Sequence, residues 1–378
     1  MSPFLDHDHS LLRVHVRQWA EKKLFPGGHE EQIDDEARRL VRQLGDEGFL
    51  RYAVPEKFGG AREKVQASDL CLIREELARA WALADTMFAV QALGSYPITL
   101  CGTEEQQQSY LPPIAKGAAI AAFALTEPEA GSDISRLQTR AIRRGKEFCL
   151  TGAKRFISNA GIADHYIVFA STAHDVKDRS ISAFVVDAQN PGLVIKEKTR
   201  VISPHPIGVV AFHECVVSEH ALLGKEGDGL KIALGTLDVL RCSVGAAAVG
   251  LAQRALEEAI DYGRKRRQFN RLLTEFQGTQ FKLAEMAVEL EAARLLVHQA
   301  AWILDSGAAD GKLKSSMAKL FATEAAQRIV DQALQIHGGM GLVAGSITER
   351  LYRDVRALRI YEGTSEIQKI VIARELLK

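Results

Sequence analysis

The spacing of apolar residues changes twice along this chain, and that change limits the folds it can adopt. From about residue 11 to 121, apolar residues recur every three or four positions, as in amphipathic helices. The following hundred residues hold short segments rich in β-branched and aromatic side chains, at 165–170, 181–188, 193–198 and 208–217. From about residue 230 the helical period returns in long segments. Because no helical pattern separates the strands, we expect a mostly antiparallel sheet between two helical regions.

The chain length of 378 residues suits two or three domains. Boundaries at the changes in spacing predict an N-terminal helical domain at 1–121, a small β domain at 122–224 and a C-terminal helical bundle at 225–378. The predicted fold class is therefore mainly α with a central antiparallel β domain. No stretch approaches 18 consecutive apolar residues, so we expect no membrane span.

Composition excludes several classes of partner. The chain has 48 Lys and Arg against 48 Asp and Glu, which gives no overall attraction to nucleic acid or to an anionic membrane. Its five cysteines are odd in number and widely spaced, which favours free thiols in a reducing compartment. The first residues show neither an apolar signal core nor the character of a transit peptide. Together these features predict a soluble cytoplasmic protein.

Several common cofactor and catalytic motifs are missing from the sequence. We find no Walker A loop, no H-E-x-x-H and no G-x-S-x-G, and we predict no metal site. A G-x-G-x-x-A string begins at Gly339, but it follows a predicted helix instead of a strand, which argues against a Rossmann site. A redox cofactor would have to be held by something other than a glycine-rich βαβ turn.

Four segments carry the candidate chemistry, and each has a structural explanation when taken alone. LTEPEAGSD at 125–133 is rich in turn formers, and the glycines of QIHGGMG at 335–341 are typical of a helix C-terminus. The basic cluster in RKRRQFNRLLTEFQ at 264–277 is usually a solvated helix face, with a nucleic-acid patch as the alternative. The acid in IYEGTSEIQ at 360–368 is equally explained as a solvated residue at a helix N-terminus.

Taken together and in this order, the four segments resemble the flavin and catalytic signatures of the acyl-CoA dehydrogenase family over essentially the whole chain. The resemblance implies the acyl-CoA dehydrogenase fold, with a C-terminal four-helix bundle and FAD as cofactor. It implies α,β-dehydrogenation of an acyl thioester, from acyl-CoA to 2-enoyl-CoA. It also implies a homotetramer with FAD at subunit interfaces, and electron transfer to an electron-transfer flavoprotein.

The resemblance assigns Glu362 as the catalytic base, which removes the α-proton while the β-hydrogen leaves as hydride to flavin N5. Such a base must be desolvated, because the α-proton of a thioester is weakly acidic. Some family members place the base just before an arginine on an earlier helix. The corresponding residue here is Leu240, before Arg241, and its apolar side chain cannot take a proton.

The resemblance also implies a set of FAD contacts. Those expected around the flavin ring and its neighbouring groups are Leu125, Thr126, Ser132, Phe156, Ile157, Ser158, Thr364 and Glu366. Those expected to bind the adenosine-diphosphate half of FAD across a subunit interface are Arg266, Phe269, Gln277, Gln335, Gly338 and Gly339. Relatives usually carry Trp-Ile-Thr where this chain has Phe156-Ile157-Ser158, and Gly where it has Asn270.

The substrate contacts that the resemblance implies are Ser132, Asp238, Arg241, Tyr361, Gly363 and Arg374. One loop departs from the family: residues 200–212 carry Pro204-His205-Pro206 where relatives usually have a G-x-R-x-S-x-T-like loop. That loop lies toward the mouth of the site in the family. A carrier-protein-tethered acyl group is therefore an alternative to acyl-CoA.

Other functions on the same fold remain as alternatives. A non-catalytic flavin-binding scaffold would tolerate loss of Glu362, which this chain keeps. A flavin monooxygenase would lack the carboxylate base. Oxygen-using oxidases of this type are mostly much longer than this chain.

Overall fold

The computed structural model describes residues 3–24, 32–173 and 180–378. The chain forms two compact units. We call them the bundle unit (Met1–Gly27, Gln66–Asp85 and Asp238–Lys378) and the sheet unit (Gly28–Val65 and Thr86–Leu237). The predicted N-terminal helical domain is thus divided between the two units. The boundaries at 121/122 and 224/225 stay a prediction.

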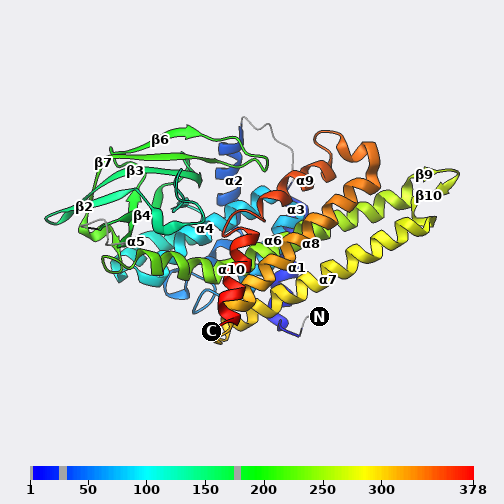
Figure 1. The fold of residues 1–378 in the computed structure, drawn as a ribbon, viewed down its shortest axis with the longest axis horizontal. Coiled ribbons are helices and arrows are strands. Elements are labelled where there is room, and N and C mark those ends of the chain that lie inside the picture. Colours follow the sequence, from blue (N-terminus) through cyan, green and yellow to red (C-terminus); the bar gives the residue numbers. More distant parts are fainter. Residues whose placement is uncertain (1–2, 25–31, 174–179) are drawn as a thin grey trace. The chain divides into compact units, whose positions relative to one another are not determined.

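The bundle unit consists of long helices (Figure 1). They are α1 (His7–Lys23), α3 (Ala67–Ala80), α6 (Gly229–Lys265, which begins in the sheet unit), α7 (Gln277–Asp305), α8 (Gly311–His337), α9 (Ile347–Ala357) and α10 (Ser365–Leu376). Between α6 and α7 stands a small hairpin, β9 (Arg267–Gln268) and β10 (Arg271–Leu272). Helix α7 packs along α8, and both α1 and α7 pack on α3.

Small side chains on α6 let the helices of the bundle unit approach closely. The buried core contains a run of alanines on this helix, including Ala246, Ala247 and Ala248. At Gly250, an added Cβ would lie 2.1 Å from the backbone carbonyl oxygen of Glu75 on α3. A side chain at position 250 would therefore push these two helices apart.

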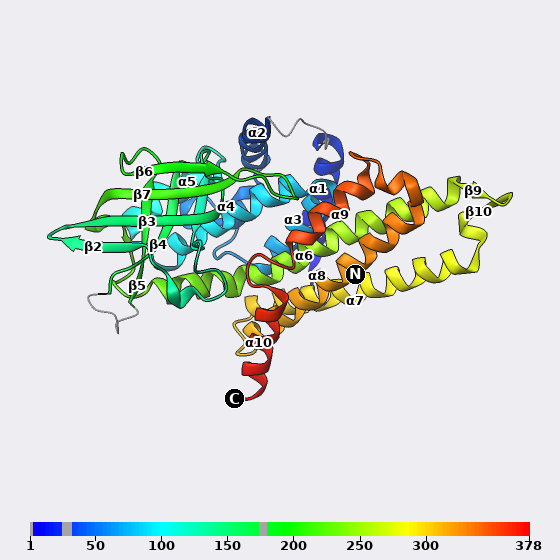
Figure 2. The ribbon, with the colours of Figure 1, turned by 45° about the horizontal axis from the view of Figure 1, so that its top comes forward.

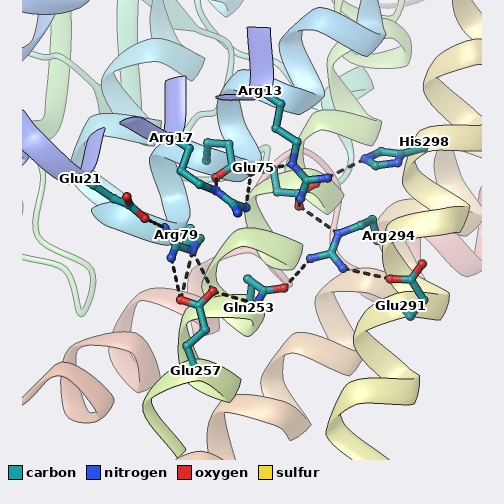
Figure 3. Close-up of polar contacts among 11 residues, drawn as sticks. Arg13, Arg17, Glu21, Glu75, Arg79, Gln253, Glu257, Glu291, Arg294 and His298 are labelled. Atoms are coloured by element: carbon teal, nitrogen blue, oxygen red, sulfur yellow. Dashed lines mark hydrogen bonds and ion pairs between the residues drawn. The ribbon is translucent and has the colours of Figure 1, made fainter. Parts of the chain in front are cut away.

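Buried ion pairs and a hydrogen bond join four helices of the bundle unit (Figure 3). Glu75 on α3 is only 2% exposed, and its Oε1 accepts from Arg13 Nη2 of α1 at 2.7 Å and from Arg294 Nε of α7 at 3.0 Å. His298 Nε2, also on α7, lies 3.4 Å from Oε2 of the same carboxylate. Arg294 donates a further hydrogen bond to Gln253 of α6 at 2.8 Å.

Among its described residues, the sheet unit holds an eight-stranded sheet with helices beside it (Figure 2). Its strands are β1 (Ala121–Ala124), β2 (Arg140–Arg144), β3 (Glu147–Ser158), β4 (His165–Ser171), β5 (Ile181–Asp187), β6 (Leu193–Lys198), β7 (Ile207–Ser218) and β8 (Leu222–Leu223). Its helices are α2 (Ile33–Asp46), α4 (Ala82–Cys101, which begins in the bundle unit) and α5 (Glu104–Ala115). The strand order is β6-β7-β3-β2-β4-β5-β8, and β1 pairs with β4. Apolar side chains of α4 and α5 share one core with β4 and β5.

The sheet is mostly antiparallel, as predicted, with two parallel pairings, β1 with β4 and β2 with β4. Strands β4 to β7 coincide with the four predicted segments to within a residue. Strands β2 and β3 were not among those predictions. In β2 only Ala141 is buried and most of its other residues are charged, so its sequence lacks the apolar pattern of a strand.

Helix α6 is long and apolar enough, by length and composition alone, to cross a membrane. However, 72% of its most apolar stretch is buried inside the protein, which is the pattern of a core helix. All five cysteines are free thiols. The thiols of Cys71 on α3 and Cys242 on α6 lie 3.7 Å apart.

Candidate active site

The predicted base, Glu362, lies in the turn between α9 and α10. Its backbone φ is +52°, and that of Gly363 is +92°, a region that side chains other than glycine rarely adopt. Thr364 caps α10, because its Oγ1 accepts from the backbone N–H of Ile367 at 3.3 Å. Gln368 Nε2 donates to the carbonyl oxygens of Glu362 at 3.3 Å and Gly363 at 2.9 Å. Helix α10 thus stabilises the turn that precedes it.

Helix α8 also stabilises this turn. Lys319 is 1% exposed, and its Nζ donates to the carbonyl oxygen of Tyr361 at 2.7 Å and to that of Gly363. The two accepting residues lie on either side of Glu362. Lys319 was not predicted from the sequence.

Glu362 is half-buried, and its Oε2 is buried with no hydrogen-bond partner among the described residues. Burial raises the pKa of Glu362, while the positive charges of Arg74, Lys319 and Arg241 act to lower it. Asp85 adds a smaller effect that raises it. A buried, unpaired carboxylate with a raised pKa is the arrangement expected of a general base.

Two of the three neighbouring cations are paired with acids of their own. Arg74 binds Asp85 through Nε at 2.7 Å and Nη2 at 3.0 Å, and Nη1 donates to Ser243 at 2.9 Å. Arg241 Nη1 donates to Asp238 at 2.8 Å, whereas the buried Nε of Arg241 has no partner in the part of the chain that the structure describes. An unpaired donor and an unpaired acceptor therefore occur in the same charged cluster.

Predicted flavin-contact residues gather at one place in the sheet unit. The backbone N–H of Arg155, next to Phe156 on β3, donates to the carbonyl oxygen of Thr126 at 2.8 Å. Buried Lys154 donates to the carbonyl oxygen of Leu125 at 3.1 Å and to Glu127 at 2.7 Å. Burial lowers the pKa of Lys154 to about 8 against the opposing effect of Glu127. These contacts fix Leu125 and Thr126 beside β3.

An irregularity in β3 exposes the predicted aromatic residue. Between Lys154 and Ile157 the register with β7 shifts, Phe156 has a φ of +57°, and its side chain is 50% exposed. Ile157, by contrast, is buried. Ser132 is exposed in the loop that follows Thr126. Phe156 thus presents an aromatic surface next to a backbone that is fixed in position.

The unusual loop at 200–212 contacts a predicted flavin-contact residue. His205 Nε2 lies 3.0 Å from Ser158 Oγ, and His205 Nδ1 lies 2.9 Å from the carbonyl oxygen of Ser203. Burial lowers the pKa of His205, so the ring is neutral at pH 7. Nδ1 must carry the proton to donate to a carbonyl, so Nε2 accepts from the hydroxyl of Ser158.

The predicted contacts to the adenosine-diphosphate half lie at one end of the bundle unit. The rings of Tyr262 on α6 and His337 on α8 stack with centroids 4.3 Å apart, which brings the C-terminal ends of these two helices together. Arg266 follows Tyr262 by four residues, and Gly338 and Gly339 follow His337. Gln335 and Gln277 are exposed as well. An added Cβ at either glycine would meet nothing within 4 Å, so their backbone is open to approach.

The β9–β10 hairpin places an aromatic side chain in solvent. Phe269 is 88% exposed, and Phe269 and Asn270 have φ angles of +50° and +61°. Asparagine tolerates this region better than most residues, so Asn270 can replace glycine in the turn. Figures 1 and 2 both show this hairpin far along the bundle unit from α10. One copy of the chain therefore does not bring Arg266 and Glu362 together.

Two of the predicted contact residues lie on α10 and are not part of the charged cluster around Glu362. Glu366 and Arg374 are both exposed, in the first and last turns of the helix. Their predicted roles stay predictions. Across residues 3–24, 32–173 and 180–378, no three His, Cys, Asp or Glu side chains gather in a metal-binding arrangement.

Comparison with known proteins identifies the family. Residues 6–118, 122–215 and 227–377 match the models of the N-terminal, middle and C-terminal domains of acyl-CoA dehydrogenases. An acyl-CoA dehydrogenase of Bacillus subtilis is 41% identical over 97% of each chain. A 3-(aryl)acrylate reductase of Clostridium sporogenes is 40% identical over 99% of this chain and 100% of its own.

Solved structures agree with this assignment. The butyryl-CoA dehydrogenase of Megasphaera elsdenii superposes with a TM-score of 0.93 at 34% identity, over 99% of each chain. A chain from a study of the electron transferring flavoprotein of Acidaminococcus fermentans gives 0.93 at 37% identity, over the full length of both. An acyl-CoA dehydrogenase of Bacillus anthracis, solved with FAD, gives 0.91 at 31% identity and covers 100% of this chain and 68% of that one. The chain belongs to the acyl-CoA dehydrogenase family, which makes it a flavoprotein oxidoreductase.

Proposed function

We propose that this protein catalyses the α,β-dehydrogenation of an acyl-CoA to the 2-enoyl-CoA, with Glu362 as the base. One observation carries the proposal: a buried carboxylate with an unpaired oxygen stands on a turn of unusual backbone geometry, held by Lys319 and Gln368. A carboxylate oxygen without a hydrogen-bond partner is free to accept a proton from a bound substrate.

In this proposal Glu362 accepts the α-proton of the bound thioester. Burial raises the pKa of the carboxylate and so makes it a stronger base. Once protonated, the side chain is neutral, which suits its buried position. The backbone N–H of Glu362 donates to the thioester carbonyl, and Gly363 leaves room for the substrate to approach.

The cofactor is FAD, which supplies the hydride acceptor when bound. The residues present fit this group. Phe156 offers an exposed aromatic face beside Thr126, and Ser158 lies two residues further along β3. Arg266 is an exposed guanidinium suited to a diphosphate, and the open backbone at Gly338 and Gly339 suits phosphate approach.

The substrate handle and the electron acceptor follow from the relatives. Among the solved relatives is a butyryl-CoA dehydrogenase, which favours CoA over a carrier protein as the thiol handle. The Acidaminococcus structure is titled for an electron transferring flavoprotein, which favours such a protein as the acceptor here. Free cysteines fit a cytoplasmic location. We keep the division at 121/122 and 224/225 as the proposed domain boundaries.

Anaerobic bleaching of the bound flavin tests this function. Purified protein is mixed with a panel of acyl thioesters of different lengths, each as the CoA and as the carrier-protein form. We expect bleaching by at least one acyl-CoA, and none by the matching carrier-protein form. Flavin that no thioester reduces would favour a scaffold. Because one relative is named a reductase, photoreduced protein is also mixed with 2-enoyl and 3-arylacryloyl thioesters.

The homotetramer is also a proposal, and a stripe of exposed apolar residues on α7 supports it. Phe281, Val288, Leu295 and Trp302 follow one another at seven-residue intervals, and Val288 is 70% exposed. Such a stripe is the seam that helices use to pack on other helices. The distance between the β9–β10 hairpin and α10 within one chain fits the same proposal, since Arg266 would then reach FAD bound to another subunit.

Val288→Glu is expected to reduce the tetramer to smaller species, because a charge would be buried in the seam. Light scattering coupled to size-exclusion chromatography measures the mass. Val14→Glu on α1 is the matched control, since Val14 is 52% exposed and lies off the stripe. A tetramer that survives Val288→Glu intact would rule out this face as the interface.

A further inference from the structure

Lys319 is a buried cation that forms no ion pair of its own among the described residues. No acidic side chain in the described ranges lies within ion-pair distance of its Nζ, whereas Arg74 and Arg241 pair with Asp85 and Asp238. Burying an ammonium group is unfavourable unless hydrogen bonds and negative charge compensate. Its hydrogen bonds go to the carbonyl oxygens of Tyr361 and Gly363, and the electrostatic compensation comes from Glu362.

Because of where these two carbonyl acceptors lie, Lys319 restrains the backbone around Glu362. The carbonyl of residue 361 belongs to the peptide plane that precedes Glu362, and the carbonyl of residue 363 belongs to the plane that follows Gly363. Fixing both restrains the backbone between them, which includes the φ and ψ angles of Glu362. A φ of +52° is unfavourable for a glutamate and persists only where surrounding contacts impose it. Lys319 makes two such contacts from α8, a helix otherwise packed in the core.

The charges around Glu362 come from four elements. Arg74 of α3 pairs with Asp85 of α4, and Arg241 pairs with Asp238 on α6. Tyr361 adjoins the base in sequence. Arg74 lowers the pKa of Glu362 most, followed by Lys319 of α8 and then Arg241. Of these three cations, Lys319 is the one with no carboxylate within ion-pair distance among the described residues.

We propose that Lys319 is a positioning residue for the base, which clamps the 361–363 turn in its reactive geometry and supplies part of the positive charge that keeps Glu362 ionised. This inference rests on the proposed function of Glu362. Burial lowers the pKa of Lys319 to about 8, against the opposing effect of Glu362. The cation is present below that pH and is lost as the pH rises through it, so flavin reduction should decline on the alkaline side.

Lys319→Met tests the proposal, with Lys319→Arg as the conservative variant and Lys314→Met on the same helix as the matched control. We expect Lys319→Met to reduce flavin about 10²-fold more slowly, the size of loss that follows a small misplacement of a reacting group. The acid limb of its pH profile should move upward, because the neutral form of Glu362 gains when the cation is removed. Lys314→Met should match the parent protein.

Lys319→Arg keeps the charge, and arginine does not lose its proton in the accessible range. We therefore expect the acid limb of the parent profile to be retained and the alkaline limb near pH 8 to disappear. Circular dichroism checks that each variant is folded. If Lys319→Met does not fold, Lys319→Arg decides, and a parent-like alkaline limb in that variant would overturn the proposal.

An infrared titration separates this inference from the proposed function. The carboxyl band of Glu362, identified by its absence in Glu362→Gln, is followed against pH in the parent and in both Lys319 variants. A midpoint that rises in Lys319→Met and stays in Lys319→Arg supports the proposal even where no thioester reduces the flavin. Unchanged midpoints and parent-like reduction would overturn it, while leaving the dehydrogenase function intact. A parent protein that no thioester reduces contradicts the function alone.

Discussion

Glu362→Gln should slow the reduction of bound flavin by an acyl-CoA about 10²–10⁴-fold, the usual contribution of a general base. The amide has the size of the carboxylate but cannot accept a proton. We expect the FAD content to stay near that of the parent, because Glu362 lies in the turn before α10 and its proposed role is proton transfer. Anaerobic stopped-flow at the flavin absorbance measures the rate.

Glu375→Gln is the matched control for that experiment. It removes the same charge from the opposite end of α10, where Glu375 pairs with Lys378 at 2.6 Å near the C-terminus. We expect the control to reduce its flavin at the parent rate. If Glu362→Gln also keeps the parent rate, the base lies elsewhere in the chain.

The pattern of apolar residues was sufficient to predict the order of the fold. Strands β4 and β5 are buried along nearly their whole length, so their sequences are continuous apolar runs that only a central strand produces. Strand β2 is mostly exposed and held by pairing with β3. Backbone hydrogen bonds stabilise this strand, and they form whatever side chains it carries. The amino-acid composition of the strand therefore does not reveal it. The division of the N-terminal helices between two units likewise depends on tertiary packing.

The site could be predicted only where a motif marks it. Glu362 was predicted through the motif that it shares with Gly363 and Thr364. The structure gives Gly363 a φ of +92° and makes Thr364 the N-cap of α10, while their substrate and flavin contacts stay predictions. Lys319 carries no such motif. Its signal is its place on α8 between the small residues Ser315 and Ala322, which put it on the buried face of an amphipathic helix.

Glu75→Gln should strongly destabilise the bundle unit. The glutamine keeps the shape of the side chain but removes the charge that Arg13, Arg294 and His298 surround. Breaking a buried ion pair by neutralising one partner costs about 3–5 kcal/mol, and we expect the lower end because Arg13 is 28% exposed. Equilibrium urea denaturation at fixed protein and FAD concentrations measures the loss.

The pH dependence of that loss has a defined sign. Burial alone would raise the pKa of Glu75, but the hydrogen bond from His298 and the charges of Arg294 and Arg13 outweigh it and hold the pKa well below its usual range. The carboxylate therefore stabilises the folded protein fully above the unfolded pKa of about 4.3, and progressively less below it. The gap in stability between the parent and Glu75→Gln should narrow as the pH falls through that value.

Glu291→Gln is the control for the Glu75 experiment, because Glu291 also pairs with Arg294, at 3.1 Å, but is 60% exposed. Exposed ion pairs contribute about 0–1 kcal/mol, so this variant should lie close to the parent at every pH. Equal losses in the free energy of unfolding of the two variants would mean that burial of the carboxylate does not determine how much its ion pairs stabilise the protein. A large loss in Glu75→Gln alone would show that the three helices α1, α3 and α7 depend on one desolvated carboxylate.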